Sequence, residues 1–141
     1  MNYLLKEHLA YTEIELKPAF HDLDPLDIVW HGNYVKYLEI ARCALLSHIN
    51  YDYLEMKASG FIWPVVDMRL KYIRPITYGR TIVIACAVVE WEHRLKISYH
   101  ITDKETGLLL HKAYTVQVAL DACSQEMLFQ TPKILAECLG A

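Results

Sequence analysis

The sequence predicts an α+β fold in which a curved antiparallel sheet of about five strands wraps around one long central helix. Two observations lead to this prediction. The helix-like segment over residues 33–50 is apolar over most of its circumference, so it has to be enclosed on several sides. Stretches with the period of β-strands then follow one another from residue 62 to residue 120, and turn residues rather than helices separate them, which favours antiparallel pairing of neighbours.

The central helix has a single narrow polar stripe. At about 100° per residue, this stripe holds Asn33, Lys36, Glu39, Ser47 and Asn50. Apolar side chains take nearly every other position, and Arg42 is the main exception. Gly32 and Asn33 mark the predicted start of the helix, because Asn is one of the residues favoured at an N-cap.

The first strands are predicted on either side of this helix. Tyr11–Lys17 precedes it and alternates apolar with charged residues, which is the period of a half-buried strand. Ile62–Tyr72 follows it and is interrupted near Pro64. Thr81–Trp91 is rich in Val, Ile and Ala on both faces, so we expect it in the interior of the sheet.

A hairpin is predicted to complete the sheet. Arg94–Thr102 has the cleanest alternation, with one set of side chains facing inward (Leu95, Ile97, Tyr99, Ile101) and the other facing water (Lys96, Ser98, His100, Thr102). Residues 103–107 have the composition of a turn, and Leu108–Leu120 is the returning strand. Short helices are expected at Tyr53–Ala58 and Pro132–Leu139.

This order of elements is that of the hotdog architecture, and we expect residues 1–141 to form one such domain. An antiparallel sheet of this kind leaves free edge strands, which natural proteins cover. We therefore expect a homodimer that pairs two sheets edge to edge, and a tetramer built from two dimers.

The composition narrows the function classes. The net charge is −3 with no basic block, so we expect no nucleic-acid partner. No apolar run reaches the roughly 18 residues that a membrane span needs, and Met1–Leu16 carries charged residues where a signal peptide would be apolar, so we expect a cytoplasmic protein. The four cysteines are widely spaced in apolar surroundings, which predicts buried free thiols and neither a disulfide nor a metal site (Cys43, Cys86, Cys123, Cys138).

The polar stretch that leads into the central helix carries the most specific motif. Asp22-Leu23-Asp24-Pro25 is followed by Ile28-Val29-Trp30-His31-Gly32-Asn33-Tyr34 and then by Tyr37-Leu38-Glu39-Ile40-Ala41-Arg42. Together with Tyr72-Ile73-Arg74-Pro75, Tyr78-Gly79 and Glu90-Trp91, this pattern resembles the hotdog thioesterases of the 4-hydroxybenzoyl-CoA thioesterase and YbgC-like acyl-CoA thioesterase type, over almost the whole chain.

The resemblance implies that Asp24 is catalytic, as nucleophile or as general base, and that the peptide N–H of His31 holds the thioester carbonyl. Elementary chemistry agrees with this assignment. The carbonyl oxygen of a thioester becomes negative when water attacks it, and the free N–H groups at a helix N-terminus stabilise an anion. A carboxylate shortly before the helix can attack the same carbon or deprotonate the water. The His31 imidazole itself is either a polar cap or a group that orients substrate or water.

Other residues of the motif have less direct roles. We expect Asp22 to fix the loop by accepting hydrogen bonds from backbone N–H groups. Glu39 is the rival catalytic carboxylate, but its spacing from Lys36 and Arg42 favours an ion pair. Asp27 stands where many relatives carry glycine, so we expect it to adopt left-handed backbone geometry.

The substrate-binding residues rest on the same resemblance. Tyr34 is expected to line the pocket, and Trp63 to lie near the acyl group, often contributed across the dimer. His93, Arg94 and Lys96 match a region that contacts the nucleotide of coenzyme A. No metal and no cofactor are implied.

Three functions are consistent with these residues. The first is hydrolysis of an acyl-CoA or acyl-carrier-protein thioester. The second is a hotdog hydratase or dehydratase in which His31 and Glu39 are the acid and base, although Asp24 has no part in that scheme. The third is a non-catalytic protein that binds acyl thioesters.

Overall fold

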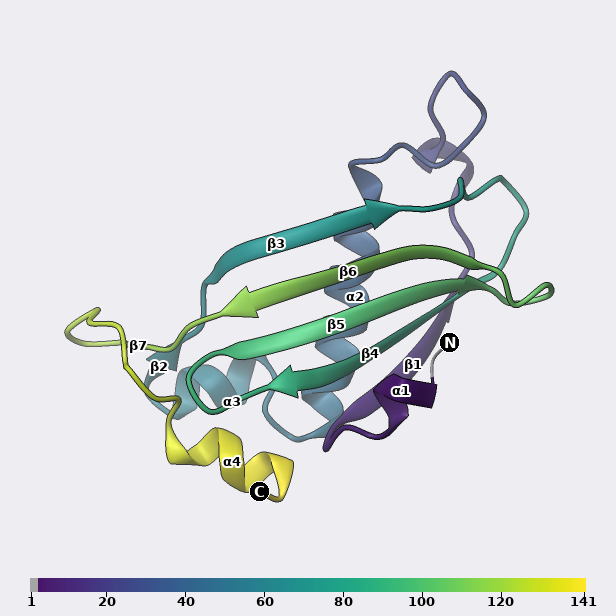
Figure 1. Ribbon diagram of the computed structural model, residues 1–141. Coiled ribbons are helices and arrows are strands. Elements are labelled where there is room, and N and C mark those ends of the chain that lie inside the picture. The colour runs from purple at the N-terminus through teal and green to yellow at the C-terminus, as the bar shows by residue number, and fades with distance from the viewer. Residues whose placement is uncertain (1–2) are drawn as a thin grey trace.

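A five-stranded antiparallel sheet forms the main layer of the protein, with the strand order β1-β4-β5-β6-β3 (Figure 1). The computed structural model describes residues 3–141; Met1 and Asn2, at the start of the predicted domain, lie outside the described residues. The strands are β1 (Tyr11–Leu16), β3 (Val65–Tyr72), β4 (Ile82–Glu90), β5 (Leu95–Asp103) and β6 (Leu109–Gln117). The predicted α+β fold is therefore confirmed, and β4 lies inside the sheet as expected.

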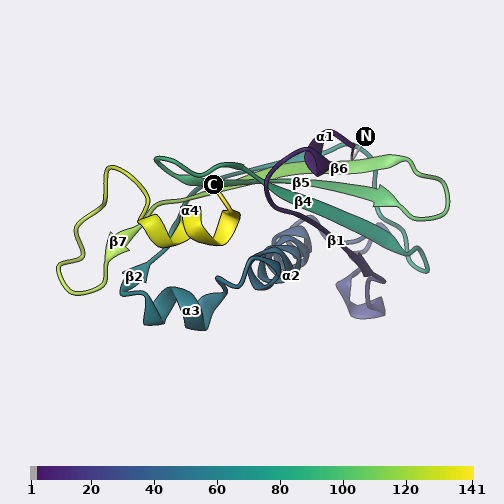
Figure 2. The same ribbon diagram turned by 90° about the horizontal axis from the view of Figure 1, so that it is seen from below.

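Helices cover the two faces of the sheet unequally. The long helix α2 (Asn33–His48) and the short α3 (Tyr53–Ala58) lie on one side, and the single turn α1 (Tyr3–Lys6) lies on the other (Figure 2). The main core is the interface between α2 and the sheet, where Tyr37, Leu38 and Leu45 meet the inward side chains of β4 and β5. The last helix, α4 (Lys133–Leu139), lies near the turn between β4 and β5.

Four short elements were not predicted from the sequence. These are α1, the 3₁₀ turn η1 (Phe20–Asp22), and the small sheet in which β2 (Phe61–Ile62) pairs with β7 (Leu120–Asp121). Strands of two residues are too short for a period-2 pattern, and only one residue of each, Ile62 and Leu120, lies within a predicted strand.

The central helix differs from the prediction at its start and on its open side. Gly32 is the N-cap and Asn33 is the first helical residue, and the Asn33 side chain donates to the Asp22 carbonyl (2.8 Å) instead of capping the helix. The sheet covers only one side of α2, so Val35 and Ile40 are 38% and 44% exposed rather than enclosed. Two apolar side chains of the helix are thus left uncovered in a single copy of the chain.

Two other expectations about burial are wrong. Cys43 and Cys123 are exposed, because Cys43 lies on the open side of α2 and Cys123 lies in the turn after β7; only Cys86 is fully buried. All four thiols are free, as predicted. On β5, the predicted inward residues are buried, but the outward ones are half-buried or, at Thr102, buried, because β5 is the middle strand and its neighbours screen it on both sides.

The sheet ends in an unpaired strand edge. β3 is hydrogen-bonded to β6 on one side only, and no other strand of residues 3–141 pairs with its second edge. No helix of this described part of the chain is long and apolar enough to cross a lipid bilayer.

Candidate active site at the start of the central helix

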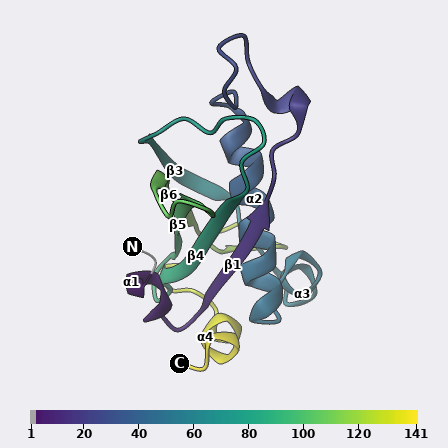
Figure 3. The same ribbon diagram turned by 90° about the vertical axis from the view of Figure 1, so that its right-hand side faces the viewer.

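The loop that carries the Asp-x-Asp motif, residues 20–32, projects beyond the sheet next to the loop between β3 and β4 (Figure 3). A backbone bond from Val29 N–H to the Ile76 carbonyl (2.8 Å) joins the two loops. Within the first loop, Asp24 N–H donates to the Ile28 carbonyl (2.8 Å) and Asp27 N–H donates to the Asp24 carbonyl (3.0 Å). This turn requires φ = +63° at Asp27, which confirms the left-handed geometry expected there.

Asp22 anchors the loop to the central helix. Its buried carboxylate accepts hydrogen bonds from the Tyr37 hydroxyl (2.7 Å), the Ala19 N–H (3.2 Å) and the Lys36 ammonium (3.3 Å). Burial alone would raise the pKa of Asp22, but these donors hold it below its ordinary value. The predicted bond to a backbone N–H is present, and two side chains of α2 add to it.

The Asp24 carboxylate is held by one donor. Its Oδ1 accepts from the Leu26 N–H (2.8 Å), which is the hydrogen bond of an Asx-turn. No group of residues 3–141 bonds the second oxygen, Oδ2. Asp24 is half-buried, so this oxygen remains available to a ligand.

His31 lies just before α2. Its N–H has no acceptor among the described residues, whereas the neighbouring Asn33 N–H donates to the Trp30 carbonyl (2.9 Å). The His31 carbonyl accepts from the Tyr72 hydroxyl (2.7 Å), and the exposed imidazole packs between the rings of Trp30 (5.2 Å) and Tyr72 (6.4 Å). The ring makes these aromatic contacts and caps no helical N–H.

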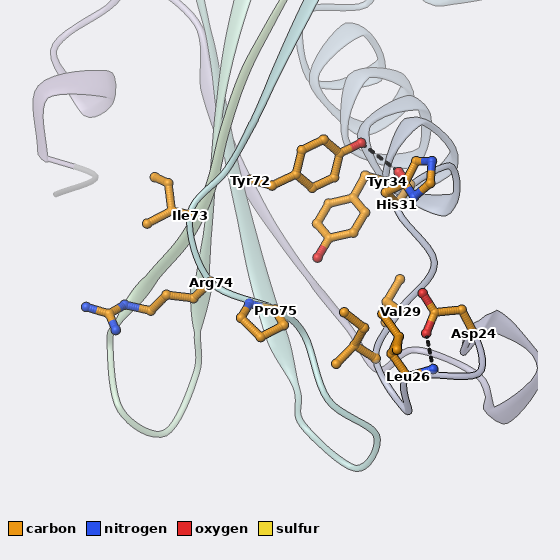
Figure 4. Close-up of a pocket in the computed structure, with 10 residues that line it drawn as sticks. Asp24, Leu26, Val29, His31, Tyr34, Tyr72, Ile73, Arg74 and Pro75 are labelled. Carbon is orange, nitrogen blue, oxygen red and sulfur yellow. Dashed lines mark hydrogen bonds between the residues drawn. The ribbon is translucent and has the colours of Figure 1, made fainter.

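Asp24 and His31 line one cavity of about 390 Å³, shown in Figure 4. The other lining residues come from the same loop, from the start of α2 and from the end of β3: Leu26, Ile28, Val29, Tyr34, Tyr72, Ile73, Arg74 and Pro75. The cavity thus brings together three of the predicted site residues, Asp24, His31 and Tyr34, and its remaining walls are mostly apolar.

An aromatic cluster forms the wall of the cavity opposite Asp24. The Tyr34 ring lies 4.8 Å from Tyr72 and 4.6 Å from His111, and the latter two rings are 4.8 Å apart. His111 is fully buried, and its two nitrogens have no hydrogen-bond partner among residues 3–141. Burial lowers its pKa to about 4, and burial raises that of Tyr34 to about 12. Sequence reasoning placed Tyr72 in the motif without giving it a role, and it missed His111, which has the pattern of an ordinary strand residue.

Trp63 and Glu39 belong to a second cavity, of about 580 Å³, at the other end of β3. Apolar side chains dominate its lining, among them Leu46, Met56 and Phe61. Glu39 forms the predicted ion pair with Arg42; Lys36, the other expected partner, bonds Asp22 instead. In a single copy of the chain, Trp63 is therefore not beside Asp24.

The three residues expected to contact a nucleotide lie on or beside the turn between β4 and β5, at the opposite end of the sheet from the first cavity. Arg94 is paired with Glu90 (2.6 Å), and the Lys96 ammonium lies over the Tyr114 ring (4.5 Å). His93 packs on Phe129, with its Nδ1 3.3 Å from that residue's carbonyl oxygen. Arg94 and Lys96 are thus already engaged within the chain.

Comparison with known proteins gives consistent results. The family described as the thioesterase-like superfamily matches residues 18–137. A Bacillus subtilis protein named "Putative acyl-CoA thioesterase YneP" is 31% identical over 115 residues, covering 81% of each chain. "Putative esterase sll0410" of Synechocystis is 32% identical over 130 residues, covering 92% of this chain and 78% of the relative.

Solved structures agree at the level of the fold. 4-Hydroxybenzoyl-CoA thioesterase from Pseudomonas sp. strain CBS-3 superposes with a TM-score of 0.78 at 18% identity, covering 92% of this chain and 99% of that one. A DHNA-CoA thioesterase from Staphylococcus aureus gives 0.76 at 24% identity, covering 84% and 80%. The hotdog fold expected from the sequence is thereby confirmed.

Proposed function

The chain belongs to the thioesterase-like superfamily, and on that premise we propose that it hydrolyses an acyl thioester to a free acid and a thiol in the cavity lined by Asp24 and His31. One observation carries the proposal: a carboxylate with an unbonded oxygen and a helix start with an unbonded N–H line the same small cavity. These are the two groups that attack at a carbonyl requires.

In the proposed reaction the His31 N–H binds the carbonyl oxygen as it becomes negative. Asp24 Oδ2 either takes the proton of the attacking water or attacks the carbon itself, which forms an anhydride that water then opens. In both routes a C–O bond replaces the C–S bond and the thiol leaves with a proton. The Leu26 N–H engages one lone pair of Oδ1, whereas Oδ2 accepts no hydrogen bond from residues 3–141 and is therefore the less restrained and more basic oxygen.

The geometry gives less support to the hydratase alternative. That reaction needs an acid and a base in one site, and its candidates were His31 and Glu39. Glu39 lines the second cavity and is paired with Arg42, whereas His31 lines the first. Within one copy of the chain the two side chains do not meet in one cavity, and in either copy Glu39 is engaged by Arg42, whereas Asp24, which that reaction does not use, has an oxygen free of donors among residues 3–141.

We propose that two copies complete the site. Antiparallel pairing of two free β3 edges about a twofold axis would bring the Val65 end of one strand beside the Tyr72 end of the other. The apolar Trp63 cavity of one copy would then lie next to the Asp24 cavity of the other and receive the acyl group, and the β4–β5 turn with His93, Arg94 and Lys96 would come to the same end. The exposed Val35 and Ile40 of α2 support a further contact between dimers.

The acyl group of the substrate is carried by either coenzyme A or an acyl-carrier protein, and the basic residues near the first cavity favour coenzyme A. Arg69, Lys71, Arg74 and Lys112 form no ion pair with an acid of residues 3–141. Lys71 lies directly opposite Lys112 in the β3–β6 pairing, which is unfavourable for like charges unless an anion joins them. Arg74 lines the cavity itself and points away from Asp24, toward the other face of the sheet (Figure 4). We propose that this cluster binds phosphates of the carrier.

Hydrolysis is tested by thiol release from short, long and aromatic acyl-CoAs. Asp24→Asn should lower turnover at least about 100-fold, while the matched control Asp27→Asn, which changes a carboxylate of the same loop outside the cavity, should retain it. Activity that survives in Asp24→Asn would contradict the catalytic assignment. Binding of acyl-CoA without turnover by the wild type would favour the binding-protein alternative, and turnover of acyl-carrier protein alone would change the carrier.

The phosphate cluster is tested by comparing acyl-CoA with the corresponding acyl-pantetheine, which lacks phosphates. Lys71→Ala combined with Lys112→Ala should raise KM for acyl-CoA about 3- to 10-fold and leave acyl-pantetheine unchanged. Lys133→Ala, an exposed lysine on α4, is the control. Equal effects on both substrates would contradict phosphate binding.

A further inference from the structure

We infer that Tyr72 is a positioning residue, whose hydroxyl fixes the peptide group at the start of α2 and thereby holds the His31 N–H toward the substrate. This inference rests on the proposed function. It starts from one contact: the Tyr72 hydroxyl, at the end of β3, donates to the His31 carbonyl at 2.7 Å, across 41 positions of sequence. The bond ties the edge strand of the sheet to the loop before the central helix.

The two peptide groups of His31 are held from different sides. The peptide group between Trp30 and His31 contains the N–H in question, and its carbonyl accepts from Asn33 N–H at 2.9 Å. Because a trans peptide is planar, this bond directs the His31 N–H the opposite way. The next peptide group, between His31 and Gly32, is held through its carbonyl by Tyr72.

Gly32 makes the second restraint necessary. A glycine has the widest choice of backbone conformations, so the peptide group before it rotates at little cost when nothing holds it. Another residue is poorly accommodated there, because an added Cβ would lie 2.4 Å from the Trp30 ring. A flexible residue therefore follows His31 directly, and Tyr72 holds the peptide group between the two, which restrains the His31 backbone on the side of its carbonyl.

The surroundings of Tyr72 keep its hydroxyl in place and protonated. Its ring makes edge contacts with Tyr34 and with His111, each at 4.8 Å between ring centres. Burial favours the neutral form of His111, so this side chain packs against the tyrosine as an uncharged ring. Burial also raises the pKa of Tyr72, which keeps the hydroxyl a donor.

The same strand carries the free edge that we propose for the dimer. Residues Val65–Tyr72 have one unpaired edge, and the last residue of this strand holds the His31 carbonyl. The position of the helix start thus depends directly on the position of the edge strand.

The test is Tyr72→Phe, compared with Tyr99→Phe as a matched control. Tyr99 is buried in the core and its hydroxyl also has one partner, Thr115 Oγ1 at 2.8 Å, outside both cavities. Tyr72→Phe should lower kcat for a good acyl thioester about 10- to 100-fold with KM changed less than about 2-fold, and Tyr99→Phe should leave kcat unchanged. Thermal unfolding of both variants is measured in parallel, since each loses one hydroxyl bond.

Each other outcome has a distinct meaning. A kcat that falls equally in both variants, or in neither, overturns the inference, because the hydroxyl would then be merely structural. A rise in KM alone would make Tyr72 a substrate contact, and loss of one limb of the pH–rate profile would make it an acid or base; either result also overturns the positioning role. Absence of turnover in the wild type would instead refute the proposed function.

Discussion

Replacing His111 by Phe should remove a pH dependence from the stability of the fold. The His111 imidazole is fully buried against Tyr34 and Tyr72, and no group in the described part of the chain hydrogen-bonds either nitrogen. Burial therefore lowers its pKa from the ordinary value of 6.5 to about 4. A phenylalanine ring keeps the aromatic contacts and cannot be protonated.

The sign and size of the effect follow from proton linkage. Between pH 6.5 and 4 the unfolded chain binds a proton at His111 and the folded chain does not, so stability that is present above pH 6.5 is lost as the pH falls. Integration of the linkage relation with these two pKa values gives a decrease of about 2 kcal/mol in the free energy of unfolding between pH 7 and pH 5. The Asp22 carboxylate has a lowered pKa and an ordinary value of 3.8, so its contribution is lost only below this window.

Urea unfolding at pH 7 and pH 5 measures this difference. Between pH 7 and pH 5 the free energy of unfolding of the wild type should fall by about 2 kcal/mol more than that of His111→Phe. Any cost of fitting the larger ring is the same at both pH values and cancels from this difference. His48→Phe, at an exposed histidine, should keep the wild-type pH dependence. Equal pH dependence in the wild type and His111→Phe would show that the buried imidazole is not the neutral group described above.

Three further predictions concern the loop before α2. Asp22→Asn should lower the free energy of unfolding, measured in urea at pH 7, by about 2 kcal/mol, because the variant loses charge-assisted hydrogen bonds. The control Asp67→Asn, at an exposed position, should change it by less than about 0.5 kcal/mol. Similar values for both variants would refute the role of Asp22 in anchoring the loop to α2. Asp27→Gly should raise the free energy of unfolding by up to about 1 kcal/mol, because φ at this position is +63° and glycine adopts left-handed backbone geometry without steric cost. A lower free energy of unfolding would show that the Asp27 backbone is not strained. Gly32→Ala should displace the Trp30 indole, because the added Cβ would lie 2.4 Å from that ring, and should shift the tryptophan fluorescence emission while the chain still folds. An unchanged emission spectrum would contradict this clash.

The sequence predicted the sheet and the helices because their patterns are local. Tyr53–Ala58 was predicted residue for residue, and in the structure Asp52 caps this helix and Gly60 follows it with φ = +89°. β4 was assigned to the interior of the sheet because it is apolar on both faces. Asp27 was expected in left-handed geometry from its place in the motif alone.

Features that depend on distant segments were beyond this reasoning. Nothing near Tyr72 in the sequence indicates that its hydroxyl reaches His31, and His111 reads as a polar residue of a strand until Tyr34 and Tyr72 enclose it. The motif placed Asp24 and His31 together because only six residues separate them along the chain. It could not reveal that Trp63 lies at the opposite end of β3, which only the direction of that strand determines.

The structure distinguishes the two carboxylates of the Asp-x-Asp motif on chemical grounds, independently of any relative. The Asp22 carboxylate is buried and saturated with donors from Tyr37, Lys36 and Ala19, which lower its pKa and occupy its lone pairs. Such a group is a weak base and a weak nucleophile, and its removal leaves several donors unpaired. Asp24 has one donor and faces a cavity. Two residues apart, one carboxylate holds the loop and the other is available to a substrate, and this division supports the catalytic role that we propose for Asp24.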